Sequence, residues 1–473
     1  MRTFITIAFY LTLMLPALAS AAQPQKPKIT QAHIDAALAT SPKYAPDRIL
    51  VRFAPGTPAA SIAQSHRVAN GLVQKTIPAL KVQLVKVPKG QVVAKLLAYR
   101  ANPNVEFAEP DYNRLLVIPT EGTDPPPPTG TGVDFFPEQW GLNNTGQLLI
   151  EPTFGIPLLT GTPDADIDAP EGWDIHTGDA SIKIAILDSG VDCNSVDLAG
   201  KCVEQTSFVT DFSATTDDLV GHGTHVAGIA AANTDNGKGT AGVGWNSSIG
   251  NLKACYAYKL EIIPDIYYIT VGVCPVSSSA AAITHAADNG YHVINMSYQS
   301  DIVDPVTGEP IDLSNPPNAE SAAVTYAWNQ GVVIVGAAGN DSNTTHVFPG
   351  ALSEVIAVAA TDRYDNLASF SSFGSSWVSI MAPGENIIST EPDLSCVLFV
   401  PGYIPGVDDC LTWKSGTSMA SPHVAGAASL LWAQLYSGQA PGSCTASNGM
   451  PCNTVVRAIL EASADSSGAL AQN

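Results

Sequence analysis

Charged and aromatic residues are scarce in this chain, at 14% and 7% of its 473 residues. Apolar residues make up 45%, which supplies a sizeable core and argues against a globally disordered chain. The length leaves room for more than one domain, at roughly 100–200 residues each.

Long apolar runs are missing after the N-terminus, so no later segment is expected to span a membrane. The chain begins MRTFITIAFYLTLMLPALASAA, with Arg2, an apolar run through Leu15, and then proline and small residues. The run is shorter than the about 20 residues of a spanning helix, and the layout is typical of a secretory signal peptide cut between Ala19 and Ala22. We therefore expect residues 1–22 to be removed and the protein to be secreted, outside the cell or into a periplasm. A buried N-terminal helix is the alternative.

Cysteine is absent from the first 190 residues, and no CxxC pair occurs, which weakens a zinc site. The eight cysteines form four pairs of close sequence neighbours, and an even number in an exported chain favours disulfides. The simplest pairing is sequential, but eight cysteines allow 105 connectivities, and the sequence leaves the choice open. The cysteines are Cys193, Cys202, Cys255, Cys274, Cys396, Cys410, Cys444 and Cys452.

Basic residues are concentrated near the start of the chain. Residues 23–115 hold 13 Lys and Arg against 5 Asp and Glu, a net charge of +8. Residues 116–473 hold 8 against 38, a net charge of −30. Opposite charge favours docking of the small unit on the large one, although the charges also suit two units that are simply kept soluble. Because an acidic surface repels phosphate, no nucleic-acid partner is expected.

The small unit, residues 23–115, is predicted to be a compact α+β module. Residues 116–138 follow as a linker and maturation region; their run of four prolines is stiff, and an exposed linker is a natural cleavage site. Alternating or apolar runs predict strands over 47–53, 80–90 and 105–112, and helical patterns cover 60–71 and 91–104.

The large unit, residues 139–473, alternates short apolar strands with helices. This order predicts an α/β fold, a parallel sheet flanked by helices on both faces, whose active site lies beyond the carboxyl ends of the strands. Asp188 and Asn340 each follow such a strand. The predicted strands are 181–190, 292–298, 332–340 and 354–362, and the predicted helices are 222–232, 321–331 and 421–435.

Four polar residues could together activate a hydroxyl group. Ser418 supplies a nucleophile, His222 a base, Asp188 an acid that orients the base, and Asn340 a donor to the oxyanion. The backbone N–H of Ser418, at a helix start, would be the second donor. Taken singly, the acid and the amide are common turn formers, and a serine there is a common N-cap. His225 forms an HxxH pair with His222, but no third metal ligand is nearby in sequence.

These motifs, DSGVD, GHGTHVAG, AAGN and GTSMASPHVAG, resemble those of the subtilisin-like serine peptidases, the subtilase family. The similarity covers roughly residues 139–464, and the order Asp, His, Ser is the order in that family. It implies a serine endopeptidase that cleaves proteins or peptides through an acyl-enzyme on Ser418, with no cofactor for catalysis. A monomer is expected.

The small unit also resembles the family's N-terminal inhibitory propeptide, through DRILVRF and NVEFAEPDY. This resemblance implies a zymogen that processes itself, with the propeptide as intramolecular inhibitor and folding assistant. Maturation is then expected between about Leu116 and Asp134.

Further site residues follow from the family resemblance. One wall of the main specificity pocket corresponds to Ser297, Tyr298 and Gln299, with Gln299 where glycine is usual, and the opposite wall to Ala337 through Gly339. Medium or large apolar side chains are expected before the cut, and an insertion over 300–319 lies beside this wall.

Calcium is the structural ion that the resemblance implies. The corresponding positions are Asp134, Asp197 and the loop that contains Asp235, and hard oxygens suit Ca²⁺. A solvated acidic loop is the alternative.

The same residues argue against three other functions. A catalytically inactive homologue acting as a binding protein is disfavoured because all four positions are intact. An esterase or lipase would carry GxSxG with the histidine last, unlike GTSMA here. An acid-acting relative would carry Glu in place of His222.

Overall fold

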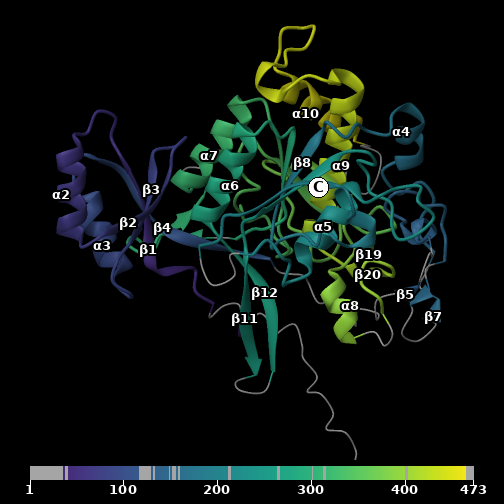
Figure 1. Cartoon of the computed structure of the whole chain (residues 1–473), viewed down its shortest axis with the longest axis horizontal. Coiled ribbons are helices and arrows are strands. Elements are labelled where there is room, and N and C mark those ends of the chain that lie inside the picture. Colours follow the sequence, from purple (N-terminus) through teal and green to yellow (C-terminus); the bar gives the residue numbers. More distant parts are fainter. Residues whose placement is uncertain are drawn as a thin grey trace, which may run out of the picture.

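The computed structural model describes two units that lie side by side, a small N-terminal one and a larger one (Figure 1). The predictions for the signal peptide and for most of the proline-rich linker lie outside the described residues. These residues are 36–37, 41–116, 129–130, 134–148, 150–151, 156–157, 160–210, 215–263, 267–300, 302–312, 316–399 and 403–464.

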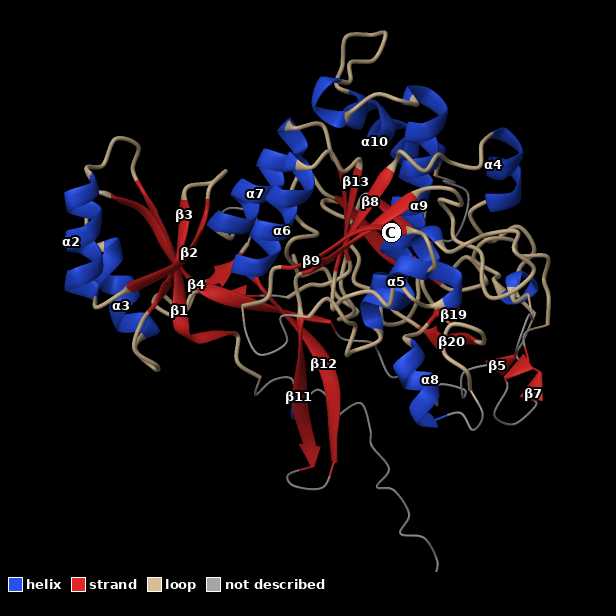
Figure 2. Ribbon diagram, in the orientation of Figure 1, coloured by secondary structure: helices blue, strands red, loops and turns tan. Residues whose placement is uncertain are grey.

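The small unit is an antiparallel sheet with two helices packed on one face (Figure 2). All five predicted elements are present, and the structure adds the edge strand β2, whose first residue, Leu72, is 67% exposed. This exposure breaks the alternation that marks a half-buried strand. The elements are β1 (Tyr44–Phe53), α2 (Ala59–Ala69), β2 (Leu72–Ile77), β3 (Val82–Lys86), α3 (Val92–Arg100) and β4 (Val105–Leu116).

The large unit is built on a seven-stranded sheet in which every pairing is parallel, so the predicted fold class is confirmed. Four of the seven strands were predicted. The order across the sheet is β18 (Ile380–Pro383), β17 (Ile356–Thr361), β16 (Val333–Ala337), β13 (Val293–Met296), β8 (Lys183–Leu187), β10 (Ser248–Lys253) and β9 (Cys202–Ser207).

Helices cover both faces of this sheet. Along β8, Ile184 and Ile186 share a core with α5 (His222–Ala231) and α9 (Thr417–Tyr436). Ala185 and Leu187 point the other way, into the core with α6 (Val276–Asp288) and α7 (Asn318–Asn329). Because successive strand residues face opposite sides, a strand buried on both faces is a continuous apolar run, which is how β8 was recognisable in the sequence.

A hairpin of the large unit extends the antiparallel sheet of the small unit, which is separate from the seven-stranded sheet. Its strands, β11 (Tyr256–Ile263) and β12 (Tyr267–Pro275), are antiparallel, and β12 pairs with β4 of the small unit. The resulting order is β11-β12-β4-β1-β3-β2. No strand was predicted over these residues. An isolated hairpin is marginally stable, and here the neighbouring strand β4 supports it.

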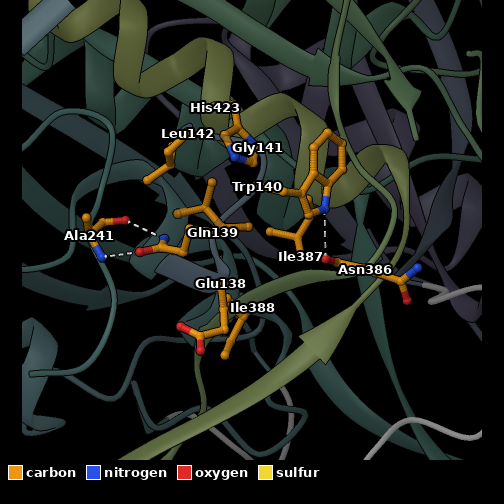
Figure 3. Close-up of a pocket in the computed structure, with 11 residues that line it drawn as sticks. Glu138, Gln139, Trp140, Gly141, Leu142, Ala241, Asn386, Ile387, Ile388 and His423 are labelled. Atoms are coloured by element: carbon orange, nitrogen blue, oxygen red, sulfur yellow. Dashed lines mark hydrogen bonds between the residues drawn. The ribbon is translucent and has the colours of Figure 1, made fainter. Parts of the chain in front are cut away.

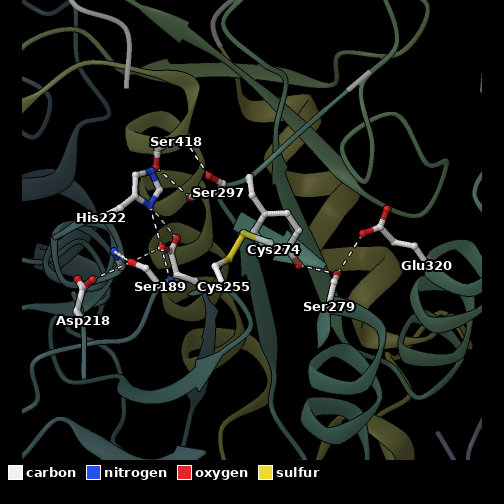
Figure 4. The surroundings of a disulfide bond; sticks show 12 residues. Ser189, Asp218, His222, Cys255, Cys274, Ser279, Ser297, Glu320 and Ser418 are labelled. Atoms are coloured by element: carbon white, nitrogen blue, oxygen red, sulfur yellow. Dashed lines mark hydrogen bonds and ion pairs between the residues drawn. A yellow bond between two sulfur atoms is a disulfide. The ribbon is translucent and has the colours of Figure 1, made fainter. Parts of the chain in front are cut away.

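The cysteines pair sequentially, which is the simplest of the connectivities that the sequence left open. The second disulfide ties the base of the β11–β12 hairpin to the loop after β10 (Figure 4). The bonds are Cys193–Cys202, Cys255–Cys274, Cys396–Cys410 and Cys444–Cys452.

The segment that follows the linker is anchored in a small pocket between α5, α9 and β19 (Figure 3). The Gln139 side chain donates to the Ala241 carbonyl at 2.9 Å and accepts from its N–H at 2.7 Å, and the Trp140 indole donates to the Asn386 carbonyl at 3.2 Å. These bonds attach Gln139 and Trp140 to the large unit, and the domain limit at residue 139 stays a prediction.

Shorter elements complete the chain. Among the described residues, no helix has the length and apolar character needed to cross a membrane. The remaining elements are β5 (Thr129–Gly130), β6 (Ile150–Glu151), β7 (Ile156–Pro157), α4 (Ala169–Ile175), β14 (Ile302–Val303), β15 (Pro310–Ile311), β19 (Ile387–Thr390), α8 (Asp393–Phe399), β20 (Asp409–Lys414) and α10 (Cys452–Ser463).

Candidate active site

Ser418 lies in the first turn of α9, which begins at Thr417. The N-cap is Gly416, whose φ of 152° favours glycine, so the alternative of Ser418 as N-cap does not hold. Its side chain is buried, and the hydroxyl donates to the carbonyl oxygen of Ser297 at 2.9 Å. The hydroxyl is therefore held just beyond the carboxyl end of β13, a central strand of the sheet.

A proline inside α9 strengthens this attachment. Pro422 has no N–H, so the carbonyl of Ser418 lacks its usual partner four residues on. The Ser297 hydroxyl donates to that carbonyl at 3.0 Å and also bonds the Ser421 hydroxyl at 2.8 Å. Ser297 and Ser418 thus hold each other through two hydrogen bonds.

His222 opens α5, and its ring is held by the carboxylate that ends β8. Its Nδ1 lies 2.8 Å from Oδ1 and 3.0 Å from Oδ2 of Asp188, with both side chains fully buried. Because a carboxylate accepts, Nδ1 carries the proton and Nε2 keeps a lone pair. Nε2 is buried and has no hydrogen-bond partner among the described residues, while Figure 4 shows the ring beside Ser418.

Two neighbours position this pair. The Ser189 N–H donates to Asp188 at 2.7 Å, and its hydroxyl donates to Asp218 at 2.8 Å. Asp218 accepts from the N–H groups of Gly221 at 2.9 Å and Thr224 at 2.9 Å, so it satisfies the free donors at the start of α5. Sequence analysis missed Asp218, although an acid four residues before the histidine in DLVGHGTH was a signal for a helix cap.

Asn340 follows β16 and faces the start of α9. Its Oδ1 accepts from the N–H of Thr417 at 2.9 Å and from the Thr417 hydroxyl at 3.0 Å. These two bonds orient the carboxamide, and its NH₂ group is the end that can donate to a ligand. The structure therefore brings together all four residues of the predicted constellation. His225 bonds the Thr412 carbonyl at 3.1 Å instead.

One strand of the small unit lies between two segments of the large unit beside this site. Leu115 of β4 donates its N–H to the Gln299 carbonyl at 3.1 Å and accepts from the Gln299 N–H at 3.4 Å. On its other side, β4 pairs with β12 in the register Arg114 to Cys274 and Leu116 to Gly272. An extended peptide bound here is held by backbone hydrogen bonds on both edges.

The predicted pocket walls face each other. Tyr298 is buried, and Ala337 with its neighbours is fully buried. A Cβ atom placed on Gly339 would lie 3.4 Å from Cδ of Gln299, so the Gln299 side chain extends to the opposite wall. Gln299 therefore lies against the opposite predicted wall, and its role in a specificity pocket stays a prediction.

Two carboxylates of β4 satisfy the free N–H groups of large-unit helices, and sequence analysis missed both. Asp111 accepts from the N–H of Ser277 at 2.9 Å in α6. Glu109 accepts from Asn318 at 2.9 Å and Ala319 at 2.8 Å in α7. Both helices follow a proline, which offers no capping side chain, and a helix N-terminus attracts negative charge.

The three predicted calcium ligands do not form a carboxylate cluster. Among the described residues, no group of three acidic, histidine or cysteine side chains is arranged to hold a metal. Asp134 and Asp235 are exposed and line one surface pocket together with Asn236. Asp197 is buried, and its carboxylate accepts from the Thr240 N–H at 2.6 Å and the Asn236 amide at 3.4 Å. Burial raises the pKa of Asp197 to about 7, and the Asp409 carboxylate adds to this effect.

Comparison with known proteins gives two family matches. Residues 179–473 match the family model described as the Subtilase family, and residues 30–111 match the one described as the Fervidolysin N-terminal prodomain.

Individual relatives cover most of the chain. It is 37% identical over 355 residues to the thermophilic serine proteinase of Bacillus sp. (strain AK1), covering 75% of this chain and 69% of that protein. It is 40% identical over 268 residues to thermitase of Thermoactinomyces vulgaris, and the match covers 57% of this chain and 80% of thermitase. The crystal structure of fervidolysin from Fervidobacterium pennivorans aligns with a TM-score of 0.56 at 26% identity, over 84% of this chain and 56% of that chain. The chain thus spans little more than half of the fervidolysin chain.

Proposed function

Because this chain belongs to the subtilase family of serine proteases and carries a fervidolysin-type prodomain, we propose that it is a serine endopeptidase, exported and made as a self-processing zymogen. One observation carries the proposal: the His222 ring is fixed by Asp188 at 2.8 Å, with its free Nε2 buried on the side of Ser418. This arrangement has a base ready for a hydroxyl nucleophile.

The reaction follows from this geometry. Nε2 of His222 removes the hydroxyl proton as Ser418 Oγ bonds to the peptide carbonyl carbon, and the carbonyl π electrons move to its oxygen. Asp188 stabilises the imidazolium that forms. The imidazolium then protonates the leaving amine as the C–N bond breaks, which leaves an ester on Ser418. Water hydrolyses that ester by the same steps and restores the hydroxyl.

The developing oxyanion needs donors that are already in place. The NH₂ group of Asn340 supplies one, because its oxygen is bound to Thr417, and the backbone N–H of Ser418 supplies the other. Removal of one such donor typically costs about 10²–10³ in kcat.

A serine-directed phosphonate probe tests the assignment. The purified protein is expected to be labelled at Ser418, and Ser418→Ala is expected to lose labelling and self-cleavage together. Ser415→Ala is the matched control, because that hydroxyl accepts from the Asn386 N–H at 2.9 Å, away from His222, and should leave both unchanged. Labelling at another residue, or normal processing of Ser418→Ala, would refute the assignment.

We also propose the domain limits: a signal peptide at 1–22, an inhibitory prodomain at 23–115, a maturation region at 116–138 and the peptidase at 139–473. Support comes from β4, which occupies the peptide-binding position beside Ser418 and would block substrates. N-terminal sequencing of the secreted product tests this proposal. A mature N-terminus outside 116–138 would contradict it.

A structural calcium ion is part of the proposal. Asp197 and the Asn236 side chain, with main-chain carbonyls of the loop 233–240, provide the oxygen donors that Ca²⁺ prefers. A buried carboxylate with a raised pKa is costly to ionise alone, and a bound cation offsets that cost. The ion would hold this loop in place and take no part in catalysis.

A further inference from the structure

The side chain of Arg114, in β4 of the prodomain, enters the large unit and is fully buried there. Its Nη2 and Nε donate to Oε2 of Glu320 at 2.5 Å and 3.2 Å, and Nη1 donates to the Ser300 hydroxyl at 3.1 Å. A buried guanidinium is tolerated only where an opposite charge and hydrogen bonds compensate its desolvation. The carboxylate and the hydroxyl in this pocket therefore suit a guanidinium group.

The pocket belongs to the large unit. Oε1 of Glu320 accepts from the Ser279 hydroxyl at 3.1 Å, and Ser279 bonds the Tyr298 hydroxyl at 2.8 Å. In Figure 4, Ser279 and Glu320 lie across the Cys255–Cys274 disulfide from His222. Because none of these partners comes from the prodomain, the carboxylate stays oriented after the prodomain leaves.

The strand register relates this pocket to Ser418. Leu115 lies opposite Gln299, and in an antiparallel pair the residue two positions later on the peptide lies opposite Ser297. The Ser297 carbonyl accepts the Ser418 hydroxyl at 2.9 Å. A substrate bound in this register therefore presents its reacting carbonyl two positions after the residue opposite Gln299. The site that Arg114 fills then holds the fourth residue before the cut.

We propose that Glu320 selects an arginine at the fourth position before the scissile bond, both in the prodomain and in substrates. The proposal rests on the proposed protease function. An apolar side chain at this position would leave Glu320 facing no cation, and buried polar groups that lose a partner are penalised strongly. Peptides with arginine at this position should be cleaved with a higher kcat/KM than peptides with lysine, because the guanidinium contacts Glu320 and Ser300 at once.

Matched peptides and the mature wild-type enzyme test the proposal. The peptides differ only at the fourth position, which carries arginine, lysine, citrulline or leucine. Citrulline keeps the shape of arginine without its charge. We expect kcat/KM for arginine to exceed that for citrulline by about 10- to 100-fold, with lysine in between.

An acidic enzyme attracts cationic peptides in general, so a second set of peptides moves the arginine one position to either side. These peptides should show no comparable gain. Equal rates for arginine and citrulline, or the same gain at neighbouring positions, would overturn the proposal. Labelling of Ser418 without cleavage of any peptide would instead count against the proposed endopeptidase function.

A variant pair supplies the second test. Glu320→Gln keeps the size and the Ser279 contact, and it should reduce the arginine-over-citrulline ratio of kcat/KM to about 1. Asp304→Asn is the control, because Asp304 pairs with the prodomain residue Arg100 at 2.7 Å, outside the pocket, and should keep the full ratio. An unchanged ratio in Glu320→Gln would sink the proposal. If that variant fails to mature, the wild-type peptide series decides.

Discussion

Single residues connect the nucleophile to the substrate-binding wall. Pro422 removes an N–H from α9, and the Ser297 hydroxyl takes its place on the Ser418 carbonyl. The Ser297 carbonyl in turn accepts the Ser418 hydroxyl. A proline in a helix costs stability where its lost bond is not replaced. Here the replacement bond comes from the segment that binds the peptide, so nucleophile and substrate share one support.

Local motifs account for what could be predicted at this scale. Asp188, His222 and Ser418 each stand in a short run whose flanking small residues are distinctive. Gly223 shows why: a Cβ there would lie 2.1 Å from the Gly190 carbonyl oxygen. Glu320 could not be predicted, because its partner is 206 residues away and nothing in its own helix distinguishes it.

The first prediction concerns Gln299. Gln299→Gly should widen the pocket before the cut, because the side chain that reaches the Gly339 wall is removed. We expect kcat/KM for peptides with phenylalanine directly before the cut to rise about 10-fold relative to alanine peptides, the scale of a few buried methylene groups. Peptide hydrolysis with both series measures this ratio, and an unchanged ratio would show that Gln299 does not limit the pocket.

At the scale of elements, the parallel sheet was predictable and the joint between the two units was not. Continuous apolar runs, such as those of β8 and β16, predict strands that are buried on both faces. The β11–β12 hairpin pairs with β4, and Leu115 of β4 pairs with Gln299, so these pairings exist only once distant segments meet. Sequence periodicity reports burial along one segment and carries no information on such partners.

The second prediction tests the helix caps that β4 supplies. Glu109→Gln with Asp111→Asn should destabilise the uncut zymogen, made in the Ser418→Ala background, by about 1 kcal/mol for each cap. Both carboxylates are buried at helix starts, and Asp111 also pairs with Arg48 at 3.2 Å.

Chemical unfolding of the zymogen measures the effect. Glu106→Gln is the control, because Glu106 is exposed and pairs with Arg52 inside the small unit. Equal losses for the control and the double variant would show that the caps contribute nothing special.

At the scale of the whole molecule, the opposite charges of the two units predicted their docking, but the contacts are more varied than charge alone. Arg114 and Arg100 of the prodomain pair with acids of the large unit, as the charges suggest. Glu109 and Asp111 are negatively charged, like the large unit that they contact. Their contacts are favourable because both carboxylates lie at helix N-termini. Net charge therefore predicted the association, and local dipoles explain part of its geometry.

The third prediction concerns acid stability. Burial lowers the pKa of His292 and of His423 to about 4 each. The unfolded chain takes up these protons below about pH 6.5 while the folded protein does not, so stability falls as the pH drops from 6.5 toward 4. Each residue should remove about 2 kcal/mol by pH 5. Unfolding of the covalently inhibited enzyme at several pH values gives the slope. His423→Gln should reduce this slope by the contribution of one proton taken up on unfolding, and an unchanged slope would contradict the assignment.

The fourth prediction concerns calcium and Asp197. A chelator should lower the unfolding temperature of the inhibited enzyme, by on the order of 5 °C, because the cation binds only the folded loop. With the pKa of Asp197 raised to about 7, its contribution to stability is present at low pH and is lost as the pH rises through 7 without the cation. The chelator effect should therefore be larger at pH 8 than at pH 5.5.

Asp197→Asn removes the charge and should remove both the chelator effect and its pH dependence. A chelator effect that persists in this variant would place the ion elsewhere, and no effect in the wild type would exclude a stabilising ion.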